Sequence, residues 1–146
     1  MQAWKWCSSL ALALLFAASA GCRHTPDETL VREAIASAAQ AAGQGDAAGV
    51  VAQLSEDFDG NAGRLARKDL AHLVRLAGWR GEHVGVTLGP VSVERRGERL
   101  VVDFRLSLTQ GSRLLPDAAG VYQVEAAWRR EGDEWRCYSA TWKRQL

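Results

Sequence analysis

The chain has almost no surplus of charge of either sign. Lys and Arg number 18 against 17 Asp and Glu, and Lys5 is the only charged residue before Cys22, which leaves 17 against 17 from Cys22 onward. Nucleic acids and acidic membrane surfaces favour clustered positive charge. The balance argues against both as the main partner. The Arg-Arg pairs at 95–96 and 129–130 are each flanked by Glu, so we expect them to be solvated hairpin ends.

Motifs for metal binding, nucleophilic catalysis and nucleotide binding are also missing. No two histidines share a metal-ligand spacing, and there is no Cys-x-x-Cys pair. A nucleophile elbow, a phosphate-binding loop and a dinucleotide fingerprint are absent, and the glycines punctuate turns instead. We therefore expect no metal, no cofactor and no catalytic set dictated by the sequence.

The first 21 residues differ in kind from the rest. Lys5 precedes an apolar run over 10–18, which has the length of a signal-peptide core and about half the length of a membrane-spanning helix. Small residues follow up to Gly21. We predict that residues 1–21 are a signal peptide removed on export. A secreted soluble protein, cut at Ala20 or Gly21, and an uncleaved membrane helix are the alternatives.

The segment "SAGC" over 19–22 resembles the lipobox of bacterial lipoproteins, although Ser19 stands where Leu is most usual. The resemblance implies cleavage before Cys22 and acylation of that cysteine, and several acyl chains hold a protein stably on a membrane. Residues 22–26 would then be the lipidated cysteine and a short tether. Because Arg23 replaces the Asp that retains many lipoproteins in the inner membrane, the resemblance implies the periplasmic face of the outer membrane.

Only one cysteine, Cys137, lies beyond Cys22 in the chain. If the sulfur of Cys22 carries a lipid, Cys137 has no disulfide partner. A lone cysteine inside a strand is most often a small buried hydrophobe. We therefore expect Cys137 to be a buried free thiol.

The part after the tether predicts one α+β domain in which three helices pack on a curved antiparallel sheet. Thr25 as a cap and Pro26 at the first helical position begin a helix whose apolar spacing continues to Ala42. Asp46 caps a shorter helix that reaches Leu54. The third helix has an inward stripe at Leu70, Leu73, Val74 and Ala77.

The rest of the chain predicts strands with one apolar face. The alternation changes parity at Gly89-Pro90, which is what one extra residue at a bulge produces. A two-residue turn at Arg96-Gly97 would pair Arg95 with Glu98. We expect a loop over 110–120.

The last hairpin, "WRREGDEWRCYSATW" over 128–142, admits two registers. A two-residue Gly-Asp turn would set Trp128 opposite Cys137 and leave Tyr138 and Trp142 on the polar side. A longer loop or a bulge would place both beside Trp128, and we predict this register because an aromatic face belongs on a core. Trp135 would then be partly exposed near the hairpin end.

Two segments resemble the nuclear transport factor 2-like superfamily: "AAQAAGQGDAAGVVAQLSEDF" over 38–58 and "GDEWRCYSATW" over 132–142. The resemblance covers about residues 27–143. It implies, for a domain over 27–146, a cone-shaped fold that encloses a pocket between sheet and helices. Members include isomerases, dehydratases, polyketide cyclases and non-catalytic binding domains, so the fold constrains the function only weakly.

Few polar residues share the inward face of the implied cone. Asp103 is expected to point outward and His72 to be a half-exposed helical residue. Asp57 and Asp59 are expected to be turn residues; in the alternative, an isomerase, dehydratase or cyclase of the SnoaL or ketosteroid isomerase type, one of them would act with Tyr122. The candidate lining of the pocket is Phe104, Tyr122, Trp128, Tyr138 and Trp142.

These features predict an exported, lipid-anchored domain that binds without catalysing a reaction. The candidate ligand is a small apolar molecule held in the cone, and the candidate partner is an envelope protein or, through the sheet, a second copy of the chain. An envelope partner would need an exposed apolar patch on the outer sheet face or near Trp135.

The lipid anchor can be tested directly at Cys22. Labelled palmitate supplied to bacteria that produce the protein should enter the wild type, because the thiol of Cys22 is the attachment point. The Cys22→Ser variant should remain unlabelled when the immunoprecipitated proteins are compared by autoradiography. Equal labelling of the two proteins would rule out this anchor.

Overall fold

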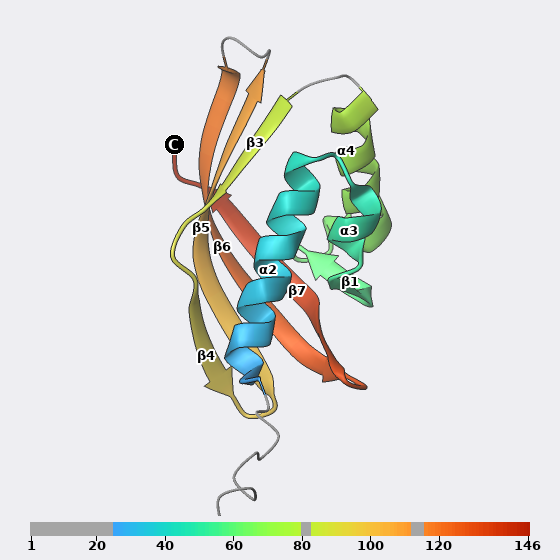
Figure 1. Cartoon of the computed structure of the whole chain (residues 1–146), viewed down its shortest axis with the longest axis vertical. Helices are drawn as coiled ribbons and strands as arrows, with labels where there is room; N and C mark the ends of the chain where they lie inside the picture. The colour runs from blue at the N-terminus through green and yellow to red at the C-terminus, as the bar shows by residue number, and fades with distance from the viewer. Residues whose placement is uncertain (1–24, 80–82, 112–115) are drawn as a thin grey trace, which may run out of the picture.

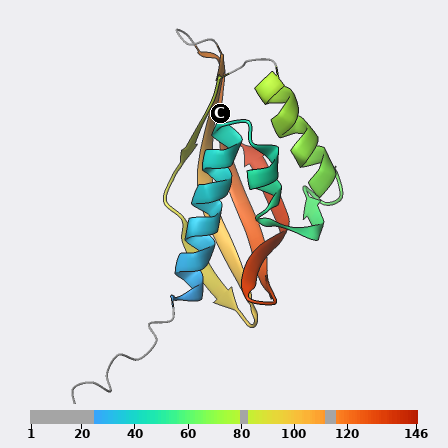
Figure 2. The ribbon, with the colours of Figure 1, turned by 45° about the vertical axis from the view of Figure 1, so that its right-hand side comes forward.

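The computed structural model describes residues 25–79, 83–111 and 116–146. In this part of the chain three helices cover one face of a seven-stranded sheet (Figures 1 and 2). The helices are α2 (Asp27–Gly43), α3 (Ala47–Val51) and α4 (Arg67–Trp79). The strands are β1 (Leu54–Gly60), β2 (Leu65–Ala66), β3 (His83–Leu88), β4 (Ser92–Arg96), β5 (Arg99–Gly111), β6 (Pro116–Glu131) and β7 (Glu134–Arg144). The predicted α+β architecture is confirmed.

The sheet is mixed, whereas the sequence predicts a purely antiparallel one. The strand order is β2-β1-β7-β6-β5-β3, with β4 also paired to β5, and β3 to β7 pair antiparallel as predicted. β1 pairs in parallel with β7. The prediction failed here because α3 ends at Val51, and Leu54 begins a strand that carries Phe58 into the core.

The helix starts are close to those predicted. Pro26 occupies the cap position of α2 with extended backbone, so the helix begins at Asp27, and the expected cap at Thr25 is not formed. Asp27 and Glu28 lie in the first turn, where acids favour the positive end of the helix dipole. Asp46 caps α3 as predicted, because its Oδ1 accepts a hydrogen bond from the Gly49 backbone N–H at 3.0 Å.

The predicted bulge at Gly89-Pro90 is confirmed by the register. Leu88 pairs with Leu106 and Ser92 pairs with Asp103, so the β3–β4 side carries one more residue than β5. The Gly89 backbone N–H donates to the Arg105 carbonyl at 2.9 Å. β3 and β4 therefore act as one bent edge strand, in which β4 pairs with the first part of β5 and β3 with the second.

The β4–β5 turn lies one residue further along than predicted. Arg96 pairs with Arg99, so the turn residues are Gly97 and Glu98. Gly97 has φ +66°, a conformation that glycine adopts readily at the first position of a two-residue turn. Each residue of β4 therefore pairs with a residue of β5 two positions from the predicted partner. Because side chains alternate every residue, every side chain keeps its predicted face. β5 and β6 extend into the expected loop over 110–120, of which 112–115 lie outside the described residues.

The β6–β7 hairpin combines features of both predicted registers. A two-residue turn at 132–133 sets Trp128 opposite Cys137. The register then shifts, because Ala127 pairs with Ser139, and Tyr138 is the extra residue. The bulge reverses the parity of the remainder of β7.

The parity change decides which aromatic residues of β7 face the helices. Trp142 lies opposite Val124, on the helix-facing side as predicted. Tyr138 lies on the other face, where its ring meets Arg129, and this part of the prediction is wrong. Trp135 is 6% exposed, so the expectation that it is partly exposed is also wrong. The start of α2 covers it, because Asp27 bonds to its indole nitrogen.

The core lies between α2 and the helix-facing side of the sheet. Side chains of α2, β1 and the three long strands form a single buried cluster: Val31, Ile35, Phe58, Leu100, Val102, Ala126, Trp128, Trp135 and Cys137. On α4, Ala71 is buried, whereas Leu73 is 51% exposed and does not point inward as predicted. The inward stripe of α4 is therefore narrower than its apolar pattern indicates.

The burial of Cys137 makes its thiol unreactive. The side chain is 4% exposed, and burial raises the pKa of the thiol to about 12. Alkylation requires the thiolate. At pH 8, iodoacetamide should modify the Cys137 peptide of the folded protein about a thousandfold more slowly than that of the urea-unfolded protein, as read by peptide mass spectrometry. Equal rates in the two states would contradict this burial.

Candidate functional site

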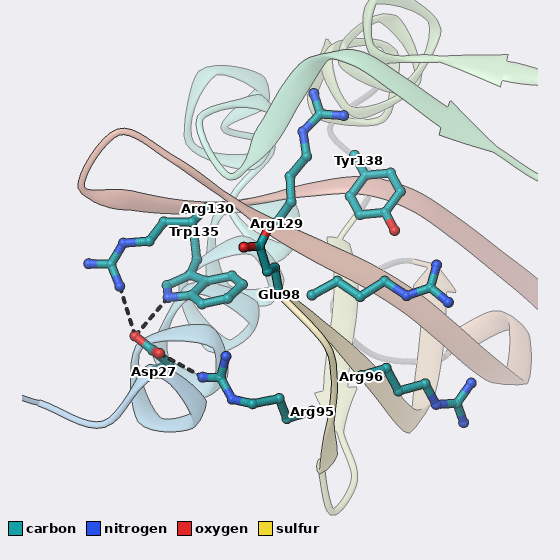
Figure 3. Close-up of a pocket in the computed structure, with 9 residues that line it drawn as sticks. Asp27, Arg95, Arg96, Glu98, Arg129, Arg130, Trp135 and Tyr138 are labelled. Carbon is teal, nitrogen blue, oxygen red and sulfur yellow. Dashed lines mark hydrogen bonds and ion pairs between the residues drawn. The ribbon is translucent and has the colours of Figure 1, made fainter.

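A pocket of about 740 Å³ lies at one end of the sheet, where the β4–β5 and β6–β7 hairpins meet the start of α2 (Figure 3). Arginines predominate among its lining residues, with two acids and two aromatic residues: Asp27, Arg95, Arg96, Glu98, Arg99, Arg129, Arg130, Trp135 and Tyr138. Strand alternation divides these residues between the two faces of the sheet. The pocket therefore has two sides.

The side that faces the helices is organised by Asp27. Its Oδ1 accepts hydrogen bonds from Trp135 Nε1 at 3.1 Å and from Arg130 at 3.0 Å, and its Oδ2 accepts from Arg95 at 2.6 Å (Figure 3). The Trp135 hydrogen bond and the two guanidinium groups lower the pKa of this carboxyl. We call these four residues the Asp27 cluster.

The indole ring in this cluster lies close to two cations. The guanidinium carbons of Arg95 and Arg130 are 5.9 and 6.0 Å from the centroid of the Trp135 ring. Cations at this distance from an aromatic face are attracted by the ring quadrupole. Each arginine thus contacts both the ring and Asp27, which fixes the two hairpins on α2.

The side that faces away from the helices carries four arginines in a line across four adjacent strands. Arg96 pairs with Arg99 and Arg129 pairs with Arg136, and the adjacent pair Leu100–Trp128 places Arg99 and Arg129 at the neighbouring position of β5 and β6. Like charges directly opposite one another destabilise a sheet. We call this line the arginine row: Arg96 on β4, Arg99 on β5, Arg129 on β6 and Arg136 on β7.

Acids hold three members of the arginine row. Arg96 lies 3.1 Å from Glu94, and Arg136 bonds to Glu134. Arg129 forms ion pairs with two acids, Asp57 and Glu131. Arg99 has no acid partner among the described residues. The row therefore contains one guanidinium group whose donors are unused.

Arg129 is fixed by two acids and a ring. Its Nη2 and Nη1 lie 2.6 and 3.2 Å from the two carboxylate oxygens of Asp57, and its Nε donates to Glu131 at 2.8 Å. Its guanidinium carbon is 5.2 Å from the centroid of the Tyr138 ring. The hydrogen bonds from Arg129 lower the pKa of Asp57.

These groups suit the binding of an anion better than proton transfer. A general acid or base works best with a pKa near the ambient pH. Asp27 and Asp57 both have lowered pKa values, so they are ionised at neutral pH. Arginine stays protonated throughout. The pocket therefore offers fixed positive charge and hydrogen-bond donors.

The structure does not bring together the acids and the tyrosine of the catalytic alternative. Asp57 lies on Arg129, which is about 23 Å from Tyr122 along an extended strand. Asp59 accepts a hydrogen bond from the Gly63 backbone N–H at 2.5 Å and so closes the β1–β2 turn. Tyr122 lies over Gly120, where an added Cβ would meet its ring at 2.9 Å.

Tyr138, one of the five aromatic residues expected to line a pocket, lines the one described above. Trp128 is 3% exposed and belongs to the core. Phe104, Tyr122 and Trp142 are half-buried on the helix-facing side of the sheet, away from this pocket. Their role as the lining of a cone stays a prediction.

The remaining candidates lie at the surface or outside the described residues. Asp103 is exposed on the outward face, as predicted, and His72 is exposed on α4. The described residues contain no group of His, Cys, Asp and Glu that could hold a metal. Cys22, Arg23, His24 and the signal-peptide segment lie outside the described residues. No described helix has both the length and the apolar character needed to cross a bilayer.

The sequence contained a signal for this pocket that the prediction did not use. The two Arg-Arg pairs lie at hairpin ends, as expected, but they converge instead of standing separately in solvent. The pairing of β5 with β6 places the two hairpin ends side by side. Two like-charged pairs at the ends of neighbouring hairpins therefore indicate a cluster.

Comparison with known proteins gives the fold. No protein-family model and no curated protein matches the chain. A nuclear transport factor 2-like protein with a cystatin-like fold from Novosphingobium aromaticivorans is 20% identical, with 94% of this chain and 89% of that chain covered and a TM-score of 0.69. Aln2 from a Streptomyces species is 15% identical, with 83% and 93% covered and a TM-score of 0.70.

A third similar structure is a Streptomyces avermitilis protein of the nuclear transport factor 2-like family, provisionally described as a dehydratase. It is 16% identical, with 84% of this chain and 99% of that chain covered and a TM-score of 0.66. The element order and these likenesses show that the chain has the nuclear transport factor 2-like fold. The fold expected from the two sequence segments is confirmed.

The Asp27 cluster makes stability depend on acid pH. The pKa of Asp27 is lowered on folding, so its contribution is fully present above the unfolded value of 3.8 and is lost as the pH falls through the folded value. The free energy of unfolding in urea should therefore be lower for Asp27→Asn than for the wild type at pH 7. This difference should shrink below about pH 4.

A matched control for Asp27→Asn is Asp133→Asn in the exposed β6–β7 turn. Its free energy of unfolding at pH 7 should stay close to that of the wild type, because substitutions at exposed turn residues usually change stability little. An Asp27→Asn difference that does not change between pH 7 and about pH 3 would show that the carboxylate charge does not hold the cluster together.

Proposed function

We propose that the chain is an exported, lipid-anchored domain that acts by binding a ligand with an acidic group, without catalysing a reaction. The observation that carries this proposal is the pocket at the end of the sheet, in which arginines outnumber acids. Proteins with this fold include one provisionally described as a dehydratase, and the fold alone does not decide the function.

The contacts of the pocket support binding over catalysis. Asp27 and Asp57, the acids with lowered pKa values, are each held by hydrogen bonds from arginine. Their charges orient guanidinium groups and are not free to accept a proton from a substrate. A pocket built in this way is pre-organised to receive an anion.

The lining also favours an acidic ligand over the small apolar one expected from the sequence. Guanidinium groups present several donors in a planar fork that matches carboxylate and phosphate oxygens. Trp135 and Tyr138 add aromatic surface, but arginine side chains lie against both rings. A purely apolar ligand would cover the guanidinium group of Arg99, which has no acid partner among the described residues, without offering its donors an acceptor, and this is unfavourable.

Membrane anchoring is supported by the sequence before the domain. Cys22 precedes the first helical residue, Asp27, by a short polar segment, and the lipobox-like residues lie directly before the cysteine. On this proposal the domain sits on the periplasmic face of the outer membrane. A homodimer through the sheet has less support, because the large exposed apolar side chains of the described residues lie on α4 and at the C-terminus: Leu73, Trp79 and Leu146.

The proposal can be tested with the protein extracted from bacterial membranes in detergent. Mass spectrometry should find a bound acidic molecule in the wild type, and Arg99→Ala should retain about tenfold less of it, because Arg99 lines the pocket without an acid partner among the described residues and its charge-assisted contact is lost. Arg75→Ala, an exposed arginine of α4, is the matched control and should retain the wild-type amount. Equal retention by all three proteins, or a bound molecule without an acidic group, would contradict the proposal.

A further inference from the structure

The outer face of α4 combines cations with apolar surface. Residues three and four positions apart lie on one face of a helix, and one such series is exposed along the whole of α4: Lys68, His72, Arg75 and Trp79. The side chain of Trp79 is 86% exposed, and that of Leu73, beside the series, is 51% exposed. We call these five residues the α4 stripe.

The cations of the α4 stripe have no partners. Neither Lys68 nor Arg75 forms an ion pair or a side-chain hydrogen bond with the described residues. The one acid in the helix, Asp69, is already engaged, because its Oδ2 accepts a hydrogen bond from the Ala66 backbone N–H at 2.8 Å. The stripe therefore carries positive charge that no acid of its own helix balances.

The apolar members of the stripe stand out among the described residues. The large exposed apolar side chains are Leu73, Trp79 and Leu146, and two of the three lie on this helix. The opposite side of α4 is occupied by the fold, since Ala71 is buried and Leu70 packs against the core. Tryptophan and arginine are the residues on which binding energy at protein interfaces most often concentrates. The α4 stripe thus has the composition of a contact surface.

Trp79 lies at the end of the domain away from the start of α2. Gly78 adjoins Gly45, just beyond α2, because a Cβ added at Gly45 would lie 3.1 Å from the Gly78 Cα. The 17 residues of α2 place its two ends about 25 Å apart. Figures 1 and 2 show the blue start of α2 and the green end of α4 at opposite ends of the molecule. With the proposed anchor just before Asp27, the end that carries Trp79 is therefore directed away from the membrane.

We propose that the α4 stripe is the docking surface for another protein of the cell envelope, one whose contact surface carries acids around an apolar recess. Trp79 and Leu73 fill the recess, and Lys68 and Arg75 pair with the acids. This inference goes beyond the acidic ligand of the pocket. It rests on the proposed anchor only for the direction in which the stripe faces.

Charge and position favour a separate protein over two other occupants. A second copy that docked through the same face in a two-fold dimer would bring the cations of the two stripes together, which is unfavourable. A bilayer would have to be reached from the end of the domain opposite the tether. The free cations and the position of Trp79 both suit a protein with acidic residues.

The docking surface can be tested with the full chain in cells of the organism that makes it. A photoreactive benzophenone amino acid replaces His72, in the middle of the stripe, and illumination joins it to whatever lies against α4. We expect a product that contains another envelope protein. Mass spectrometry should place the joined peptide in a segment where Asp and Glu outnumber Lys and Arg. The same amino acid at Thr141, exposed on β7, should not give this product.

Substitutions in the photoreactive protein test the chemistry of the contact. Arg75→Glu should reduce the product about tenfold or more, because it sets an acid against acids. The matched control, Lys143→Glu, makes the same change of charge at an exposed residue of β7 and should leave the product unchanged. Trp79→Ala should also reduce the product about tenfold, and Trp79→Phe, which keeps an aromatic ring, should reduce it less. All these side chains are exposed, so the free energy of unfolding in urea should stay close to that of the parent protein.

The inference is overturned if no other protein is joined at position 72, or if the product contains only a lipid or a second copy of the chain. It is equally overturned by an unchanged product in Arg75→Glu or in Trp79→Ala, or by an equal loss in Lys143→Glu. None of these results touches the proposed function, because the pocket lies at the other end of the domain. Loss of the acidic ligand in Arg99→Ala would in turn leave the α4 contact in place, so the two claims can fail separately.

Discussion

The carboxylate of Asp27 joins the first helix of the domain to two hairpins of the sheet, and the rest of the structure depends on this contact. It lies in the first turn of α2 and bonds to Arg95 from the β4–β5 hairpin and to Arg130 and Trp135 from the β6–β7 hairpin. The three elements enclose one end of the core, and the buried ring of Trp135 lies beneath the ion pairs. A single ionised group thus sets the position of the helix against the sheet and forms one wall of the pocket.

Two bulges decide which side chains reach that pocket. The bulge at Gly89-Pro90 lets one bent edge follow β5 along its length, which brings Arg95 and Arg96 to the hairpin end. The bulge at Tyr138 keeps Trp142 on the helix-facing side and sends the tyrosine ring to the other side, against Arg129. Extra residues that a regular sheet would not contain therefore supply both the curvature of the fold and an aromatic border of the site.

The sequence predicts most of the fold and little of the site. Helical spacing, the Asp46 cap and strand alternation identify the main elements, because each reflects contacts between near neighbours in the chain. The sequence favours a helix exit or turn at Asp57 and Asp59 over a short strand, and the strand forms because residues 54–60 pair with the distant β7. The arginine row was missed for the same reason: Arg96 and Arg129 look like separate solvated turns until the pairing of β5 with β6 sets them side by side.

The long-range pairing of the N-terminal elements also fixes when the domain can finish folding. Trp135 contacts Asp27 across 108 residues, and Leu54 of β1 pairs with Cys137 of β7. Contacts between such distant segments form slowly, because a long loop must close first. A chain that emerges N-terminus first therefore keeps Val31 and Ile35 of α2 without their β7 partners until β7 has emerged. The core around Val31 and Ile35 therefore closes only after β7 is in place, because Trp135 and Cys137 of β7 belong to it.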